Sequence, residues 1–106
     1  MSLMLNTQEF VDHIESFSGS LIETLKKKNA EYGADNSPFH NFIVAGTLEG
    51  LEPEQALRGM MTKHVVSIYD MLQDAESYSI EQWREKIGDN IVYLLILEAM
   101  LSPENS

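Results

Sequence analysis

The chain has 106 residues, 43% apolar and 23% charged, which is enough for one domain with one hydrophobic core. It contains no cysteine, so disulfides and thiolate metal sites are excluded and a reducing cytoplasm is the expected location. The net charge is −10, with 7 basic against 17 acidic residues, and this argues against binding to long nucleic acid, whose phosphates are held by clustered Lys and Arg. The longest apolar run, residues 91–97, is far shorter than the roughly 20 residues of a transmembrane helix, so no membrane partner is expected.

The first predicted helix begins at Asn6, because Asn6 with Glu9 three residues later forms a capping box. Residues 1–5 precede it as a leader that takes no part in the fold. The helix is predicted to end near Tyr32 and Gly33, where glycine supplies the left-handed C-cap conformation. Its apolar residues recur at spacings of three and four, as one face of a long helix requires: Phe10, Ile14, Phe17, Leu21 and Leu25.

A short second helix is predicted over residues 38–48, with Ser37 as its cap, Pro38 in its first turn and Gly50 after its end. Pro53 is predicted to open a third helix. The apolar face of that helix has clear helical spacing and includes one histidine: Leu57, Met60, Met61, His64, Ile68, Met71 and Leu72.

The fourth predicted helix spans residues 79–101, with Ser79 and Gln82 as a second capping box and Trp83 placed to pack on Tyr78. Residues 91–97 are apolar on every side, which is typical of a helix surrounded by protein. A chain of this length cannot easily surround such a helix alone. The sequence therefore predicts a single all-α domain over residues 1–106, a four-helix bundle completed by a second subunit, with a frayed tail at residues 102–106.

Polar residues crowd the end of the first helix and the middle of the third. Asn29, Glu31, Tyr32 and Asp35 form either a ligand-binding turn or an ordinary helix cap with an Asx turn. His64 is either a core histidine or a ligand contact, and its neighbour Lys63 either pairs with Asp70 or contacts phosphate. Ser67 and Asp70 follow at helical spacing as a polar stripe. The basic cluster Lys26, Lys27 and Lys28 is either a solvated face or a phosphate contact.

Glu85 and Asp89 share one face of the fourth helix and together would suit a hard cation such as Mg²⁺. In the alternative, Glu85 is solvated and Asp89 pairs with a neighbour. Asp89 lies in strongly apolar surroundings, where an ionised carboxylate requires a cation, a network of donors or a metal. Asn90 lies beside it as a further polar candidate.

Four short segments in this order resemble the phage-associated family known as nucleotide modification associated domain 1. They are Lys-Asn-Ala-Glu-Tyr-Gly at 28–33, Phe-His-Asn-Phe at 39–42, Lys-His at 63–64, and Gly-Asp-Asn-Ile-Val-Tyr-Leu at 88–94. The resemblance covers about residues 20–101. That family is similar to the MazG-like all-α nucleoside triphosphate pyrophosphohydrolases, which hold Mg²⁺ and a triphosphate between acidic helices and cleave between the α and β phosphates.

The resemblance implies a homodimer or homotetramer that binds a nucleotide with Mg²⁺. It assigns Asp89 as the closing aspartate of the second acidic motif and Glu31 as the acid of the first helix, so these two are the expected catalytic residues. Glu31, Glu85 and Asp89 are the expected metal ligands. The expected substrate contacts are Lys28, Lys63, His64 and Asn90.

The chain also departs from the family pattern in two places. The paired glutamates of the usual first motif are replaced by Lys26, Lys27 and Lys28, and Lys86 stands where a glutamate precedes Asp89. Fewer carboxylates mean weaker metal binding, whereas lysines would bind phosphate directly. Two readings therefore stay open: a Mg²⁺-dependent nucleotide-binding protein, with or without pyrophosphohydrolase activity, and a catalytically silent helical oligomer that binds a protein partner. The six methionines favour the second reading, because Met-rich faces adapt readily to partners.

Overall fold

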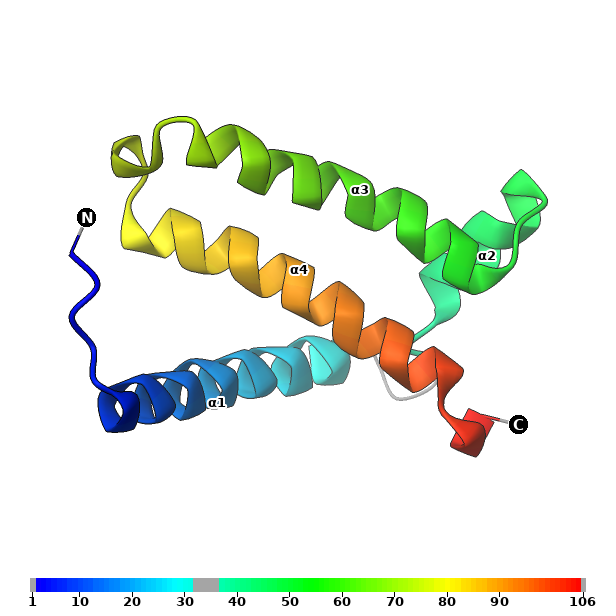
Figure 1. The fold of residues 1–106 in the computed structure, drawn as a ribbon. Helices are drawn as coiled ribbons and strands as arrows, with labels where there is room; N and C mark the ends of the chain where they lie inside the picture. Colours follow the sequence, from blue (N-terminus) through cyan, green and yellow to red (C-terminus); the bar gives the residue numbers. More distant parts are fainter. Residues whose placement is uncertain (1, 32–36, 106) are drawn as a thin grey trace. The chain divides into compact units, whose positions relative to one another are not determined.

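The computed structural model describes residues 2–31 and 37–105, apart from the side chains of residues 29–31. Every regular element in this part of the chain is helical, so the all-α prediction is confirmed. The elements, drawn in Figure 1, are α1 (Thr7–Glu31), α2 (His40–Glu49), α3 (Pro53–Leu72), the 3₁₀ helix η1 (Ala75–Ser77), α4 (Ile80–Leu101) and the 3₁₀ helix η2 (Pro103–Asn105). The chain divides into two compact units, Met1–Ser37 and Pro38–Ser106, which are described separately.

The first unit consists of α1 and the segment before it. The capping box predicted at its start is confirmed: the Glu9 N–H donates to Asn6 Oδ1 at 2.9 Å, and the Asn6 N–H donates to Glu9 Oε1 at 3.0 Å. The first four N–H groups of a helix lack partners within the helix, and the capping box supplies one to Glu9, which explains why α1 begins at Thr7. The end predicted near Tyr32 and Gly33 lies outside the described residues.

The second unit begins with α2, which starts at His40 and not at Pro38 as predicted. The carbonyl of Phe39 accepts hydrogen bonds from the N–H groups of Phe42 and Ile43, each at 3.0 Å, so the first helical turn closes on Phe39. The end of α2 follows the prediction. Gly50 takes up the left-handed conformation, with φ of 71°, and its N–H bonds the carbonyl of Gly46.

The turn from α2 into α3 depends on a close approach at Gly46, which is buried. A Cβ atom on Gly46 would lie 2.6 Å from the carbonyl oxygen of Leu51, closer than any real contact. Leu51 also donates its N–H to the Gly46 carbonyl at 2.8 Å. Helix α3 then begins at Pro53, as predicted, behind a capping box of Glu52 and Gln55 that the sequence analysis did not identify.

Helices α3 and α4 lie side by side and antiparallel, joined through η1 (Figure 1). The predicted Ser79–Gln82 capping box is present, with hydrogen bonds of 2.8 and 3.1 Å. Trp83 contacts the Tyr78 ring edge-on at 6.2 Å and donates its indole N–H to the Ala75 carbonyl at 3.0 Å. The aromatic packing predicted at this helix start is therefore confirmed, and it ties α4 to η1.

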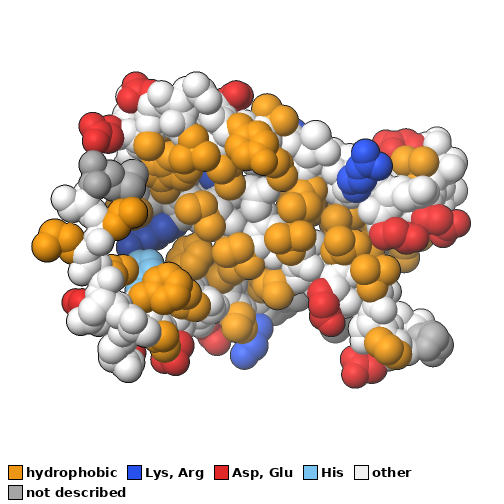
Figure 2. Space-filling view, viewed as in Figure 1, with side chains coloured by type: hydrophobic (Ala, Val, Ile, Leu, Met, Phe, Trp, Pro, Cys, Tyr) orange, Lys and Arg blue, Asp and Glu red, His pale blue; other side chains and the backbone are white. Residues whose placement is uncertain are grey.

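The core of the second unit is small. Its buried apolar side chains, counted over the described residues, are Phe42, Ala56, Leu57 and Met71. The apolar run of α4 is not surrounded by the described part of the chain, because Leu94 and Leu95 are 52% and 46% exposed. Hydrophobic side chains also occupy much of the surface visible in Figure 2. Large apolar side chains of the described helices thus remain exposed to water.

Candidate functional site

Asp89 of α4 lies on the seam between α3 and α4, where its carboxylate faces His64 of α3. The Nδ1 atom of His64 lies 3.7 Å from Oδ2 of Asp89, a distance at which the two form an ion pair when the imidazole is protonated. The side chain of His64 is 19% exposed and that of Asp89 36% exposed. Asp89 is therefore half-buried, with one oxygen beside an imidazole and solvent within reach. The contact with His64 agrees with the alternative in which Asp89 pairs with a neighbouring residue.

Tyr93 and Asn90 of α4 contact His64, and Phe42 of α2 packs against Tyr93. The Tyr93 ring lies 5.1 Å from the His64 ring, tilted by 41°, and Phe42 meets Tyr93 edge-on at 6.2 Å. Asn90 donates its amide N–H groups to the carbonyls of Lys86, at 2.9 Å, and His64, at 3.3 Å. Asn90, predicted as a substrate contact, thus uses its donors to hold α4 against α3.

Tyr93 responds electrostatically to the same surroundings. Burial raises the pKa of the Tyr93 phenol above its ordinary value, and the negative charge of Asp89 raises that pKa further. Both effects favour the neutral phenol. Tyr93 is therefore a neutral wall of the site at physiological pH, and its titration reports the charge on Asp89.

A groove continues along the seam, one helical turn from the His64–Asp89 pair. Its volume is about 400 Å³. Glu85, which is exposed and precedes Asp89 by one turn, lines it, so the two predicted metal ligands of α4 are neighbours on one face. Residues of α3, of the segment before α4 and of α4 itself line the groove: Ser67, Asp70, Met71, Tyr78, Gln82, Glu85 and Lys86.

The described residues contain no group of three or more His, Asp or Glu side chains placed to share a metal ion. Mg²⁺ prefers oxygen ligands and is commonly held by one or two carboxylates together with the phosphates of a substrate. Glu85 and Asp89 match that smaller requirement, since they are adjacent on α4 and both reach solvent. The third predicted ligand, Glu31, has its side chain outside the described residues.

Two of the predicted site residues, Lys28 and Glu31, belong to the first unit. Lys28 is exposed near the end of α1, and the neighbouring Lys26 forms an exposed ion pair with Glu23 at 3.6 Å. That pair fits the interpretation of the basic cluster as a solvated face. Lys63, in the second unit, is exposed beside His64.

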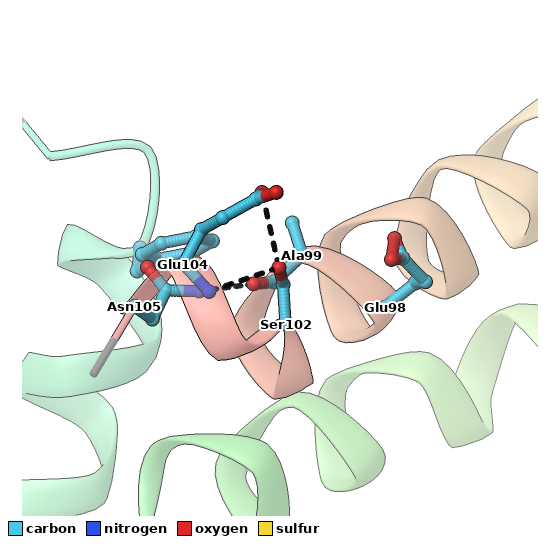
Figure 3. Close-up of a pocket in the computed structure, with 6 residues that line it drawn as sticks. Glu98, Ala99, Ser102, Glu104 and Asn105 are labelled. Atoms are coloured by element: carbon cyan, nitrogen blue, oxygen red, sulfur yellow. Dashed lines mark hydrogen bonds between the residues drawn. The ribbon is translucent and has the colours of Figure 1, made fainter.

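A second hollow, of about 230 Å³, lies at the end of α4 (Figure 3). The Ser102 hydroxyl donates to the Glu104 carboxylate at 3.1 Å, and the Asn105 amide donates to the Ala99 carbonyl. These bonds close η2 where the sequence predicts a frayed tail, a short capped turn that the local pattern did not reveal. The polar groups of Ser102, Glu104 and Asn105 bond to one another and to the end of α4, so the hollow is explained by capping and not by chemistry.

The sequence indicated the polar stripe of Ser67 and Asp70 and the acid Glu85 of α4, but not that these three residues line one groove. Their common position depends on the register of α3 against α4, which Asn90 fixes through a contact 26 residues away along the chain. Tyr93 was missed as a wall of the site. It belongs to the apolar run, and nothing in the local pattern separates it from the leucines around it.

A comparison of the chain with protein-family models, curated proteins and solved structures found no match. Across the described helices, none has a stretch of sufficient length and apolar character to span a membrane.

Proposed function

We propose that this protein binds a nucleoside or deoxynucleoside triphosphate with Mg²⁺ at the α3–α4 seam around Asp89, as part of cytoplasmic nucleotide metabolism. The observation that carries the proposal is the position of Asp89 in the apolar helix α4. Its carboxylate is half-buried, close to His64, and still open to solvent on the face that it shares with Glu85. A carboxylate kept in such a place, beside a groove of ligand size, is typical of a functional site.

Three groups of residues have separate roles in this proposal. Glu85 and Asp89 would hold the cation through oxygen atoms, His64 keeps the Asp89 carboxylate in position, and Lys63 supplies positive charge for phosphates. Mg²⁺, when bound with a triphosphate, neutralises phosphate charge and polarises the phosphoryl oxygens. The resemblance to the phage-associated family, which covers the segment of Asp89, supports the choice of a nucleotide over other phosphorylated compounds.

Hydrolysis to a monophosphate and pyrophosphate is the activity to test first. The experiment measures Mg²⁺-dependent pyrophosphate release from a panel of ribonucleoside and deoxyribonucleoside triphosphates, with Asp89→Asn as the matched variant. Release that requires both Mg²⁺ and Asp89 supports an enzyme. Binding without release supports a nucleotide-binding protein that lacks catalysis. The absence of both nucleotide binding and pyrophosphate release would contradict the proposal.

We also propose that the chain forms a homodimer or homotetramer. The described residues bury few apolar side chains, while large apolar residues on α1, α3 and α4 are exposed, among them Ile14, Tyr69 and Leu94. Large exposed apolar surface often marks association sites in proteins. Assembly would complete the core that the apolar run of α4 requires.

The same exposed surface favours a second candidate function, a catalytically silent oligomer that binds a protein partner. A thermal-shift screen with nucleotides and Mg²⁺ separates the two candidates, because a ligand that binds only the folded state raises its apparent stability. Stabilisation that disappears in Asp89→Asn supports the nucleotide. No stabilisation by any nucleotide favours the interaction module.

A further inference from the structure

The groove lies between α3 and α4, as the His64–Asp89 pair does, and it runs along the two helices away from Asp89. Ser67 lies one helical turn beyond His64 on α3, and Asp70 a further turn beyond Ser67. On α4 the lining runs in the opposite direction, from Lys86 back to Gln82, as antiparallel helices require. The His64–Asp89 pair and the groove are therefore consecutive turns of one polar strip between the two helices.

The size and lining of the groove suit a flat, polar, partly aromatic group. Its volume of about 400 Å³ lies within the range of roughly 300–1,000 Å³ for small-molecule sites. Tyr78 offers a ring at its edge. The side-chain oxygen Oε1 of Gln82 accepts the Ser79 N–H at 2.8 Å, which leaves the side-chain NH₂ of Gln82 to act as a donor. Asp70 contributes a carboxylate, an acceptor with two oxygen atoms side by side.

The ends of the groove differ in chemistry. Lys86 and Glu85 lie at the end nearest Asp89, where the proposed Mg²⁺ and phosphates would bind. Asp70 is six residues from His64, which is about 9 Å along a helix. That separation is comparable with the reach of a nucleoside from its phosphates to its base. The phosphate end and the Asp70 end therefore fit the two ends of one nucleotide.

We infer that this groove is the base-binding part of the site and that Asp70 selects guanine. The inference rests on the proposed nucleotide function. Guanine presents two adjacent N–H donors, on N1 and on its exocyclic amino group, and these match the paired oxygens of a carboxylate. Adenine and cytosine place a ring-nitrogen acceptor beside their amino group, which would face a carboxylate oxygen unfavourably. Uracil and thymine have one N–H between two carbonyl acceptors.

The test is isothermal titration of the full chain with GTP, ATP, CTP and UTP in the presence of Mg²⁺. GTP is expected to bind at least about tenfold more tightly than the others, since a site built to bond two donors rejects bases that lack them. Asp70→Asn replaces one acceptor oxygen with a donor at nearly constant shape. This variant is expected to lose the preference for GTP while it still binds triphosphates. Glu81→Gln is the control, because Glu81 is exposed on α4 and does not line the groove.

The outcomes separate this inference from the function on which it rests. Triphosphates that bind equally well, or a guanine preference that survives Asp70→Asn, overturn the inference and leave the nucleotide site in place. Absence of binding by all four nucleotides overturns both. Because Asp70 is exposed, its variant should fold, and an unchanged thermal unfolding midpoint without ligand verifies this.

Discussion

At the scale of single residues, the site is defined by a carboxylate that shares a small space with an imidazole and a phenol. Asp89 affects Tyr93 without a direct hydrogen bond, because the negative charge of a carboxylate opposes formation of a phenolate nearby. The electrostatic link is measurable, and it does not depend on the identity of any ligand.

Asp89→Asn is expected to lower the pKa of Tyr93 toward its ordinary value of about 10, because the charge of Asp89 is removed while burial remains. The measurement is a phenolate absorbance titration, in which the signal of Tyr93 is isolated by subtracting the corresponding Tyr93→Phe protein in each background. An unchanged titration of Tyr93 would show that Asp89 does not act on this ring.

The direction of the pKa shift also fixes an effect of pH on stability. The unfolded chain loses the Tyr93 proton near pH 10, whereas the folded chain keeps it to a higher pH. In that interval the folded state binds more protons, so the free energy of unfolding falls as the pH rises. Chemical denaturation in alkaline buffers should show a smaller loss for Tyr93→Phe than for the unchanged protein. Equal losses would contradict the raised pKa.

Gly46 is the residue whose replacement should be least tolerated by the fold. Gly46→Ala is expected to destabilise the protein by about 1–3 kcal/mol, because the new methyl group meets the backbone carbonyl of Leu51 and no side chain can move to relieve the contact. Gly59→Ala is the matched control. Gly59 lies inside α3 with nothing within 4 Å of a Cβ atom, so alanine should stabilise by about 0.5–1 kcal/mol. Equal effects in denaturant unfolding would refute this account of the turn.

At the scale of secondary-structure elements, the caps explain where the helices begin. Ser79→Ala should cost about 1 kcal/mol, since it removes the acceptor of the Gln82 N–H while the packing of Trp83 on Tyr78 remains. Ser79→Asp keeps an acceptor oxygen and should cost much less. Urea unfolding of both variants checks the difference, and similar losses would mean that the cap contributes little.

The helices were predictable because each is encoded locally. Asn6 with Glu9, Pro53, and Ser79 with Gln82 are start signals readable within four residues, and all three mark observed helix starts. The start of α2 was misplaced because Ser37-Pro38 resembles a cap, while the carbonyl that closes the first turn belongs to Phe39.

The site was predictable only in part, for a related reason. Asp89 was identified because a carboxylate beside an apolar run is a local anomaly. Its partner His64 was identified as a candidate, but their pairing needs the register between two helices, which no local pattern encodes. The groove around Asp70 depends on the same register.

At the scale of the whole molecule, uncovered apolar surface is the feature that most requires an explanation. Leu94 and Leu95 lie in the run that the sequence predicts to be surrounded, and both remain about half exposed. Removal of such residues from water contributes about 25 cal/mol per Å² of apolar surface, which favours association. Assembly and nucleotide binding are separate proposals and can be tested separately.

Leu94→Glu and Leu95→Glu are expected to shift the protein from an oligomer toward a monomer, because a charge at a covered apolar contact is costly to desolvate. Light scattering coupled to size-exclusion chromatography measures the mass of each variant. Thr62→Glu adds the same charge at an exposed polar position of α3 and should leave the mass unchanged. A monomeric unchanged protein, or an oligomer unaffected by both leucine variants, would contradict assembly through α4.

The central claim is that Asp89 serves a nucleotide, and calorimetric titration with triphosphates and Mg²⁺ tests it most directly. The account predicts saturable binding of at least one triphosphate to the unchanged protein, with a loss of at least about tenfold in affinity in Asp89→Asn, since a charged contact to the bound complex is removed. Nucleotide affinity that is equal in the two proteins, or absent from both, would contradict it.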